Sequence, residues 1–373
     1  MTNIFVFLFL VLFPFGQIIR IGIIQPTDII VGLAALYSIF AKLEKPKIFK
    51  HFENLLLIVV FTYLLSIFIF WSKDLVYGLL YLFRLIAYSY FLIYVWNFAS
   101  TKANRDLLFN SLISLSLVSA LFGWIQYFTF PDLKPFFVYG WDMHLFRLVG
   151  TFLDPTFLGL IIVFGLLLLI HRSISTLNWK NVLAILFLTV SLAFTYSRGS
   201  YLAFLAGISV LGLYQKKFKY LLILSIILVG IVLVLPTSRN HSVELLRSFS
   251  AVARVDNYIE TLKVYKSSPL FGVGFNNICL ARQKIIGIES FESHACSGSD
   301  SSLLLILATA GISGLMSFIY LANKVWKESN DIFKIVAASL LVHSLFSNSL
   351  FYPWIMGYMT ILLAISLRTK TEG

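Results

Sequence analysis

The sequence predicts an all-α fold: a polytopic integral membrane protein with about twelve transmembrane helices and one large periplasmic loop. Two features of the composition support this, because 59% of the 373 residues are hydrophobic and only 12% are charged, whereas soluble domains are about 45–50% apolar and about 25% charged. The third observation is that long, continuous apolar runs recur along the chain, each sufficient to cross about 30 Å of hydrocarbon as a helix. Alternating barrel strands are therefore excluded.

The apolar runs define the expected helices, which together form a single membrane domain over residues 1–373. No repeat or low-complexity segment divides the chain. The first run lacks a basic region and a small-residue cleavage site, so we expect a retained span and not a signal peptide. The expected spans are 4–19, 25–41, 54–71, 76–98, 107–128, 154–170, 182–196, 200–214, 220–235, 301–322, 332–350 and 353–367.

The basic residues predict the orientation of these helices. Connections between the spans alternate in lysine and arginine content, with fifteen on one side and five in the short connections of the other. Because short cytoplasmic loops are the basic ones, both termini are expected in the cytoplasm and the loops 129–153 and 236–300 on the far side. The net charge of +12 is spread over short loops, which argues against nucleic acid as a partner.

The long loop 236–300 is expected to be folded. Apolar residues recur at helical spacing between Val255 and Tyr265, and Ser268-Pro269 ends the pattern, which predicts one helix over about 250–266. The following turn, Gly272-Val273-Gly274, is no dinucleotide fingerprint, because the third glycine is missing.

Both cysteines of the chain, Cys279 and Cys296, fall in this loop. An oxidising exterior permits a disulfide between them, and closing a loop of this length contributes roughly 3 kcal/mol. Two unpaired thiols are the alternative. We predict the disulfide.

Two arginines are candidates for binding an anion. Arg198 lies in the turn 197–200 at the outer end of a predicted span, where Ser200 can cap the next helix and the first-turn amides lie beside the guanidinium. The alternative is an interfacial arginine that snorkels to water. Arg84 lies about 12 Å along the fourth span, where a charge must face protein or water. We expect it to face an outward-opening cavity; a structural arginine bonded to neighbouring carbonyls is the alternative.

Acidic and histidine side chains give three further candidates. Asp300 precedes an apolar helix and is either an N-cap or an acid/base group. Asp154, followed by Pro155, is expected to be the N-cap of the sixth span. His343 lies inside the eleventh span and is expected to be hydrogen-bonded to a neighbour. The sequence contains neither an Asp-x-Asp pair, nor a phosphate-cradling glycine loop with lysine, nor a His/Cys cluster at metal spacing, so we expect neither a cofactor nor a metal site.

Three segments in this order resemble the O-antigen polymerase and ligase family of bacterial envelope proteins. The resemblance covers residues 184–320, about a third of the chain, around the large loop. The first segment contains the Ser-Arg-Gly turn, the second an arginine followed by a helix and a Pro-Leu-Phe-Gly-Val-Gly run, and the third an aspartate before a helix with two glycines. They are residues 194–203, Arg254 with Leu262 and 268–275, and 300–304 continuing to 311–315.

The resemblance implies a membrane glycosyltransferase of the bacterial inner membrane. Its donor would be a glycan on undecaprenyl diphosphate, used at the periplasmic face together with other polysaccharide assembly proteins. Family arginines that hold the diphosphate match Arg198 and Arg254, and Arg147 resembles another; Arg84 would lie beneath them. Ligases carry an essential histidine at the position of Asp300, so the aspartate favours a polymerase with Asp300 as the catalytic base.

Two other functions remain open at this point. An O-antigen ligase, which transfers glycan to lipid A-core, is the alternative within the enzyme class. A transporter or flippase for a lipid-linked glycan is the alternative outside it, although such proteins commonly show internal repeats that this chain lacks.

Overall fold

The computed structural model describes residues 3–20, 22–139, 143–174, 178–216, 218–234, 249–287 and 298–371. Within these residues the chain is all-helical, as predicted, and no β-strand is present. The nearest approach to a strand is an isolated antiparallel bridge between Asp132 and Leu145. The all-α fold class is therefore confirmed.

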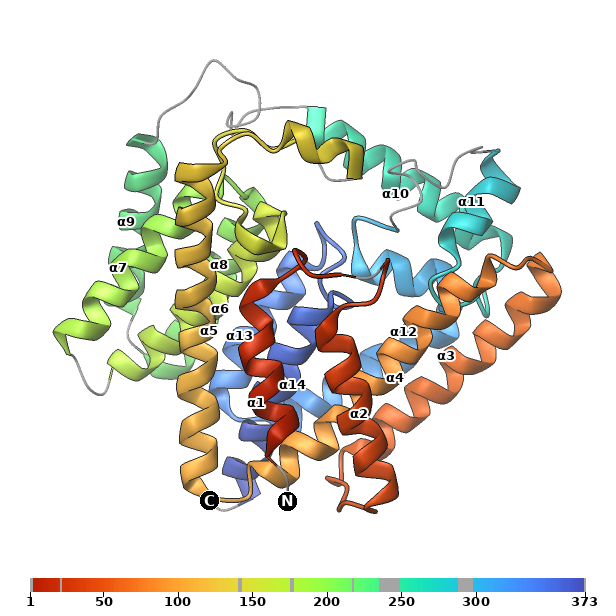
Figure 1. The fold of residues 1–373 in the computed structure, drawn as a ribbon, viewed down its shortest axis with the longest axis horizontal. Coiled ribbons are helices and arrows are strands. Elements are labelled where there is room, and N and C mark those ends of the chain that lie inside the picture. Colours follow the sequence, from red (N-terminus) through yellow and green to blue (C-terminus); the bar gives the residue numbers. More distant parts are fainter. Residues whose placement is uncertain are drawn as a thin grey trace.

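The described helices run in chain order and form one bundle (Figure 1). The beginning of α1 and the end of α14 lie at the same end of the bundle, and α10 and α11 lie across the opposite end. The α-helices are α1 Ile4–Leu12, α2 Pro26–Phe40, α3 Phe49–Phe70, α4 Leu75–Phe98, α5 Lys102–Thr129, α6 Pro155–Ser173, α7 Trp179–Phe194, α8 Arg198–Gln215, α9 Phe218–Val234, α10 Phe249–Ser267, α11 Ile278–Ile286, α12 Ser302–Glu328, α13 Asp331–His343 and α14 Pro353–Thr371, with short 3₁₀ helices at Phe13–Phe15, Lys134–Tyr139 and Gly150–Phe152.

Five of the described helices are long and apolar enough to cross a membrane: α3, α4, α5, α6 and α12. Shorter apolar helices occur at Ile4–Phe15, in α2 and in α7. These helices identify a membrane protein. The expected number of twelve spans is not confirmed.

Two predicted spans end early, each for a local reason. The span predicted over 332–350 stops as α13 at His343, and residues 344–352 form turns before Pro353 starts α14. The side chains of Ser344 and Ser349 in that segment bond to the backbone carbonyls of Leu340 and Ser347 and compete with the helix. The span predicted over 4–19 stops at Leu12, because Pro14 falls in a 3₁₀ turn.

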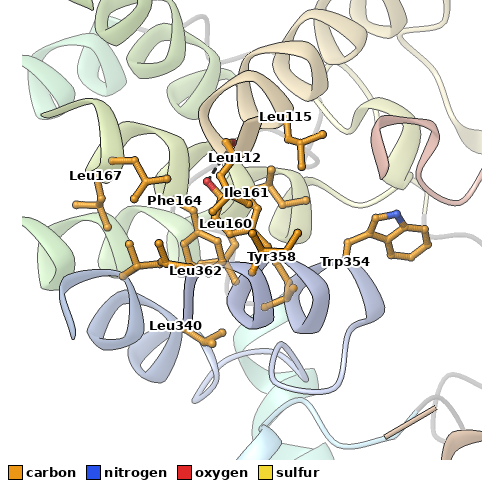
Figure 2. Close-up of a cluster of buried hydrophobic side chains, with 14 of the residues drawn as sticks. Leu112, Leu115, Leu160, Ile161, Phe164, Leu167, Leu340, Trp354, Tyr358 and Leu362 are labelled. Atoms are coloured by element: carbon orange, nitrogen blue, oxygen red, sulfur yellow. Dashed lines mark hydrogen bonds between the residues drawn. The ribbon is translucent and has the colours of Figure 1, made fainter. Parts of the chain in front are cut away.

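The core of the bundle is α6, the most buried of the five long apolar helices. Figure 2 shows its residues Leu160, Ile161 and Phe164 between Leu112 of α5 and Tyr358 of α14. Tyr358 Oη donates to the Leu112 carbonyl at 3.2 Å. This largely buried helix supports the helices that carry the candidate site.

Glycines let α5 and α8 approach α6 closely. A Cβ added at Gly159 would lie 2.8 Å from Ser200 Cβ, and one added at Gly165 would lie 2.6 Å from Ser116 Oγ. Small residues serve in this way at helix interfaces in membranes. The Gly159 contact holds the first turn of α8 against the beginning of α6.

A break in α12 holds the segment that follows α10. Gly311 has φ 67° and ψ −169°, which no helix tolerates. The segment 269–274 enters the break and forms four backbone hydrogen bonds there: Val273 N to Ala308 O at 3.1 Å, Gly274 N to Thr309 O at 2.9 Å, Ile312 N to Pro269 O at 2.9 Å and Ser313 N to Leu270 O at 3.3 Å. A break within a membrane helix must satisfy its freed backbone groups, and here the Pro-Leu-Phe-Gly-Val-Gly run satisfies them. The end of α10 is thereby fixed to α12.

Candidate functional site

Arg198 is the first residue of α8, at the end of the bundle near α10. The N-cap is Ser197, whose Oγ accepts from Ser200 N at 3.3 Å; the expectation that Ser200 would cap the helix was wrong. The side chain of Arg198 is half-buried. Burial lowers the pKa of its guanidinium, and the like charge of Arg254 lowers it further. Arg198 and Arg254 therefore lie within each other's electrostatic field.

A chain of polar side chains lies beneath this helix end. Ser200 Oγ donates to the Thr156 carbonyl at 3.1 Å and lies 3.5 Å from His343 Nε2. His343 Nδ1 lies 2.5 Å from Ser349 Oγ. The histidine is fully buried, and its hydrogen bonds confirm the structural interpretation of this residue. It connects the beginnings of α6 and α8 to the turns after α13.

The turns at 344–352 also bind the beginning of α12. Ser302 N donates to the Ser344 carbonyl at 2.9 Å, and Leu350 N donates to Ser302 Oγ at 3.1 Å. The N-cap of α12 is Ser301, whose Oγ accepts from Leu304 N at 3.4 Å. Capping therefore does not account for an aspartate at position 300. By contrast, the capping predicted for Asp154 is confirmed, because its Oδ1 accepts from Thr156 N at 2.6 Å.

The predicted loop helix is present as α10, and its polar face lies against the beginning of α12. Arg254, Asn257, Tyr258 and Thr261 are spaced by three or four residues and share this face. Tyr258 Oη donates to the Leu345 carbonyl at 2.6 Å, and Asn257 Oδ1 accepts from Asp300 N at 2.9 Å. The pKa of the Tyr258 hydroxyl is raised by burial, lowered by Arg254 and raised by Asp300. The Tyr258 hydroxyl therefore lies within the electrostatic field of both Arg254 and Asp300.

The apolar stripe of α10 lies on the other side of the helix. Val255, Ile259 and Leu262 are each at least 39% exposed on the protein. An outward apolar stripe on a helix beside a broken membrane helix is suited to contact with lipid. The face of α10 that packs against the protein carries the polar Asn257 and Thr261 and the fully buried Val264, which packs with Leu305 of α12.

Arg198, Arg254 and Asp300 are brought together around the turns at 344–352. They come from the beginning of α8, from α10 and from the residue before the cap of α12. The charge of Arg254 acts on Arg198, and Arg254 and Asp300 both act on Tyr258. The arrangement places two guanidiniums and one carboxylate at one end of the bundle.

Arg84 differs from the expectation of a side chain available to a ligand. Its Nε donates to Asp28 Oδ1 at 3.0 Å, and its Nη2 donates to Asp28 Oδ2 and to the Ile23 carbonyl, both at 2.5 Å. Both side chains of the ion pair are almost buried. The physical reason is that a charge at this depth requires a countercharge. Asp28 was missed, although an aspartate inside an apolar predicted span was a signal for such a pair.

Arg147 is also held by the protein itself. Its side chain is 5% exposed, and its Nε and Nη2 donate to the carbonyls of Thr195 and Tyr196 at 2.9 and 3.1 Å. These carbonyls follow the last turn of α7, where helix ends leave acceptors without intrahelical partners. The Arg147 guanidinium thus binds the carbonyls at the end of α7, and its role as a diphosphate ligand stays a prediction.

An apolar cavity lies below this end of the bundle, between α3, α4, α12, α13 and α14. Its volume is about 230 Å³ and its lining is almost entirely apolar. It shares Leu85, Phe351 and Met356 with a small pocket whose polar lining residues include Arg84 and Asn348. Asn348 Oδ1 in turn accepts from Ser302 Oγ at 3.4 Å. The protein thus offers a large apolar space with a polar end beside the first turn of α12.

Two further expectations concern metal ligands and the disulfide between Cys279 and Cys296. In the described ranges, no group of three histidine, cysteine or acidic side chains is arranged to hold a metal ion. Cys279 is disulfide-bonded. Its predicted partner, Cys296, lies outside the described residues, so the pairing of these two residues stays a prediction.

Comparison with known proteins identifies the segment that contains this site. Residues 183–319 match a family model described as O-antigen ligase. No curated protein matches the chain significantly. The matched segment includes Arg198, Arg254 and Asp300 but neither Arg84 nor Arg147. It confirms the resemblance seen in the sequence and supports, at this level, a role in polysaccharide assembly at a membrane.

Proposed function

Because residues 183–319 are an O-antigen ligase family segment of a membrane protein, we propose that this chain is a polymerase of O-antigen or another surface polysaccharide. It transfers a glycan carried on undecaprenyl diphosphate to the hydroxyl of another sugar at the periplasmic face of the bacterial inner membrane. The observation that carries the proposal is the gathering of Arg198, Arg254 and Asp300 at one end of the bundle, with Ser301 and not Asp300 as the helix cap.

The two arginines suit a diphosphate. The guanidiniums of Arg198 and Arg254 lie within each other's field, so an anion that binds beside both is attracted by two positive charges. A diphosphate supplies that anion and accepts the forked donors of both guanidiniums. The first-turn amides of α8 add the favourable end of a helix dipole. Arg198 and Arg254 are therefore the donor-binding residues of the proposal.

The cavity suits the lipid part of the donor. A polyprenyl chain is apolar and belongs in a space such as the cavity between α3, α4 and α12–α14. The polar pocket at its end adjoins Asn348, which contacts Ser302 at the beginning of α12. A donor with an apolar chain and a charged head group fits a site in which an apolar cavity leads to polar residues at the beginning of α12.

The chemistry follows from the charges of the three residues. The oxygen of the acceptor hydroxyl attacks the anomeric carbon of the donor, and the bond between that carbon and the diphosphate oxygen breaks. The electron pair leaves with the diphosphate, whose growing negative charge the two guanidiniums stabilise. The hydroxyl proton passes to the Asp300 carboxylate. The products are the extended glycan and undecaprenyl diphosphate.

The ligase is the second candidate, favoured by the description of the matched family model. It transfers glycan to lipid A-core instead of to another glycan. The aspartate at position 300 favours the polymerase, because the ligases that this segment resembles use a histidine there.

Deletion of the gene distinguishes these functions through the length distribution of the surface polysaccharide. If the protein is a polymerase, its deletion removes the long chains and leaves single repeat units on the final anchor. If the protein is a ligase, its deletion leaves no glycan on the anchor, and lipid-linked polymer accumulates. Polymer stranded on its carrier at the cytoplasmic face identifies a flippase, and an unchanged polysaccharide refutes all three.

A further inference from the structure

We propose that Asn257 and Arg282 are positioning residues that hold Asp300 in place relative to Arg254. This inference rests on the proposed function, in which Asp300 accepts the proton and Arg254 binds the diphosphate. The two residues come from α10 and α11, and both bind the short segment 298–300 that leads into α12.

Arg282 is the centre of this network. Its side chain has no exposed surface, which is unusual for a charged residue. Its Nη1 donates to the Gly298 carbonyl at 3.0 Å, and its Nη2 donates to Thr261 Oγ1 at 3.0 Å and to the Asn257 carbonyl at 3.4 Å. Nε lies 3.6 Å from the Glu260 carboxylate. One guanidinium thus links α11, two turns of α10 and the segment before Asp300.

The charge of Arg282 is held from two sides. Burial lowers the pKa of the guanidinium, and the carboxylates of Glu260 and Asp300 raise it. Asp300 therefore lies close enough to be attracted by the charge that fixes its own backbone. The network thus acts on Asp300 in two ways, through hydrogen bonds to the backbone of residues 298–300 and through charge on the carboxylate.

Both polar atoms of the Asn257 side-chain amide form hydrogen bonds to the segment 298–300. Its Oδ1 accepts from Asp300 N at 2.9 Å, and its Nδ2 donates to the Gly298 carbonyl at 3.3 Å. Gly298 has φ 115°, a conformation that favours glycine. The Gly298 carbonyl therefore receives donors from both Asn257 and Arg282, and the backbone has little freedom on either side of Ser299.

The position of Asn257 on α10 links this grip to the diphosphate site. Arg254 precedes Asn257 by three residues, so both lie on the same face of one rigid helix. Fixing Asp300 to Asn257 consequently fixes the carboxylate relative to the Arg254 guanidinium. The reaction requires this spacing, because base and leaving group lie on opposite sides of the attacked carbon.

The polar network is costly for a segment that only needs to be packed. Apolar residues of similar volume commonly replace a buried charged cluster without loss of stability. A network that binds 298–300 at several points instead supplies a defined position. That property is needed for a group that must lie within hydrogen-bond reach of a proton it accepts.

A double-mutant cycle tests the inference with the full chain in lipid nanodiscs. The substrate is the lipid-linked glycan extracted from cells that lack the gene, and product formation is measured under single-turnover conditions. In Asn257→Ala, we expect the maximal rate to fall roughly 10- to 100-fold, the cost of a misplaced reacting group, with the donor KM nearly unchanged. Arg282→Met should behave in the same way.

The cycle separates positioning from a general loss of structure. If Asn257 acts through Asp300, Asn257→Ala should cost little further rate in an Asp300→Asn background, because coupled residues are not additive. Equal losses in both backgrounds overturn the inference, as does a wild-type rate in Asn257→Ala. Rates are normalised to folded protein, and Lys263→Met, an exposed charge on the same helix, is the control that should keep full activity.

The outcome also distinguishes this inference from the function on which it rests. A wild-type protein that forms no glycosidic product refutes the proposed function. An active wild type, an Asp300→Asn variant whose single-turnover rate is strongly reduced but still measurable, and additive losses at Asn257 would leave the function standing and remove the positioning role.

Discussion

Replacing Gly311 with alanine should undock the loop from the break in α12. The residue has φ 67° and ψ −169°, a region that only glycine populates readily, at a cost of about 1–3 kcal/mol for other residues. A Cβ there would lie 2.5 Å from Phe271 N and closer still to the Leu270 carbonyl. The contact is to backbone, which cannot rotate away.

The loss has an upper limit set by the junction itself. Four backbone hydrogen bonds join 269–274 to the break, and each contributes about 1 kcal/mol. Undocking therefore relieves the clash at a cost of about 4 kcal/mol, and we expect Gly311→Ala to destabilise the protein by about 2–4 kcal/mol. Because this segment directly follows the end of α10, Arg254 should lose its position and the polysaccharide should shorten.

The assay is thermal unfolding in detergent, combined with the length of the polysaccharide made in cells. The matched control is Gly32→Ala in α2, where an added Cβ meets no atom within 4 Å; alanine in a helix is there expected to be neutral or to stabilise by up to about 1 kcal/mol. A Gly311→Ala protein with wild-type unfolding and wild-type polymer would refute the account of the break.

Three further substitutions and one topology measurement test the rest. Asp300→Asn should give a folded protein that makes little long polymer in cells, since Ser301 caps α12; wild-type polymer from this variant would remove Asp300 from the mechanism. Arg198→Lys should shorten the polymer although the positive charge is kept, because lysine lacks the forked donors that fit a phosphate. The control Arg172→Lys, in the last turn of α6 and away from the site, should leave the polymer length unchanged. Arg84→Met should destabilise by about 3–5 kcal/mol through the buried carboxylate it leaves, and the double variant Arg84→Met/Asp28→Leu should recover most of this in unfolding experiments. Reporter fusions at Lys47 and Lys263 should report opposite sides of the membrane; the same signal from both would contradict the orientation derived from the basic loops.

Helices with strong apolar periodicity or local end signals could be predicted from the sequence. The loop helix predicted over 250–266 is α10, Phe249–Ser267, because its pattern and its proline stop are local. The cap at Asp154 was predictable for the same reason. The end of α13 at His343 was not, since it depends on serine contacts with α12.

The site was predictable only in part, because partners distant in the sequence decide what a charge does. The sequence does not distinguish Arg84 and Arg147 from Arg198. In the structure, however, Arg84 forms an ion pair with Asp28, and Arg147 donates to a carbonyl at the end of α7. Arg282 gave no signal, because nothing local shows that its helix is buried against α10. The capping explanation of Asp300 failed for a reason visible only in three dimensions, the capping of Leu304 N by Ser301.

The pairing of Arg84 with Asp28 bears on where the leaving group is held. A paired guanidinium adds little net charge, so the pocket that Arg84 lines offers polar contacts without strong attraction for an anion. The nearby like charges of Arg198 and Arg254 supply that attraction at the end of the bundle. In the proposed mechanism, the diphosphate is therefore expected to bind at Arg198 and Arg254, outside the apolar cavity that would hold the lipid chain. We propose that this separation places the attacked carbon at the end of the bundle, between the leaving group and Asp300, where an acceptor sugar can arrive from water.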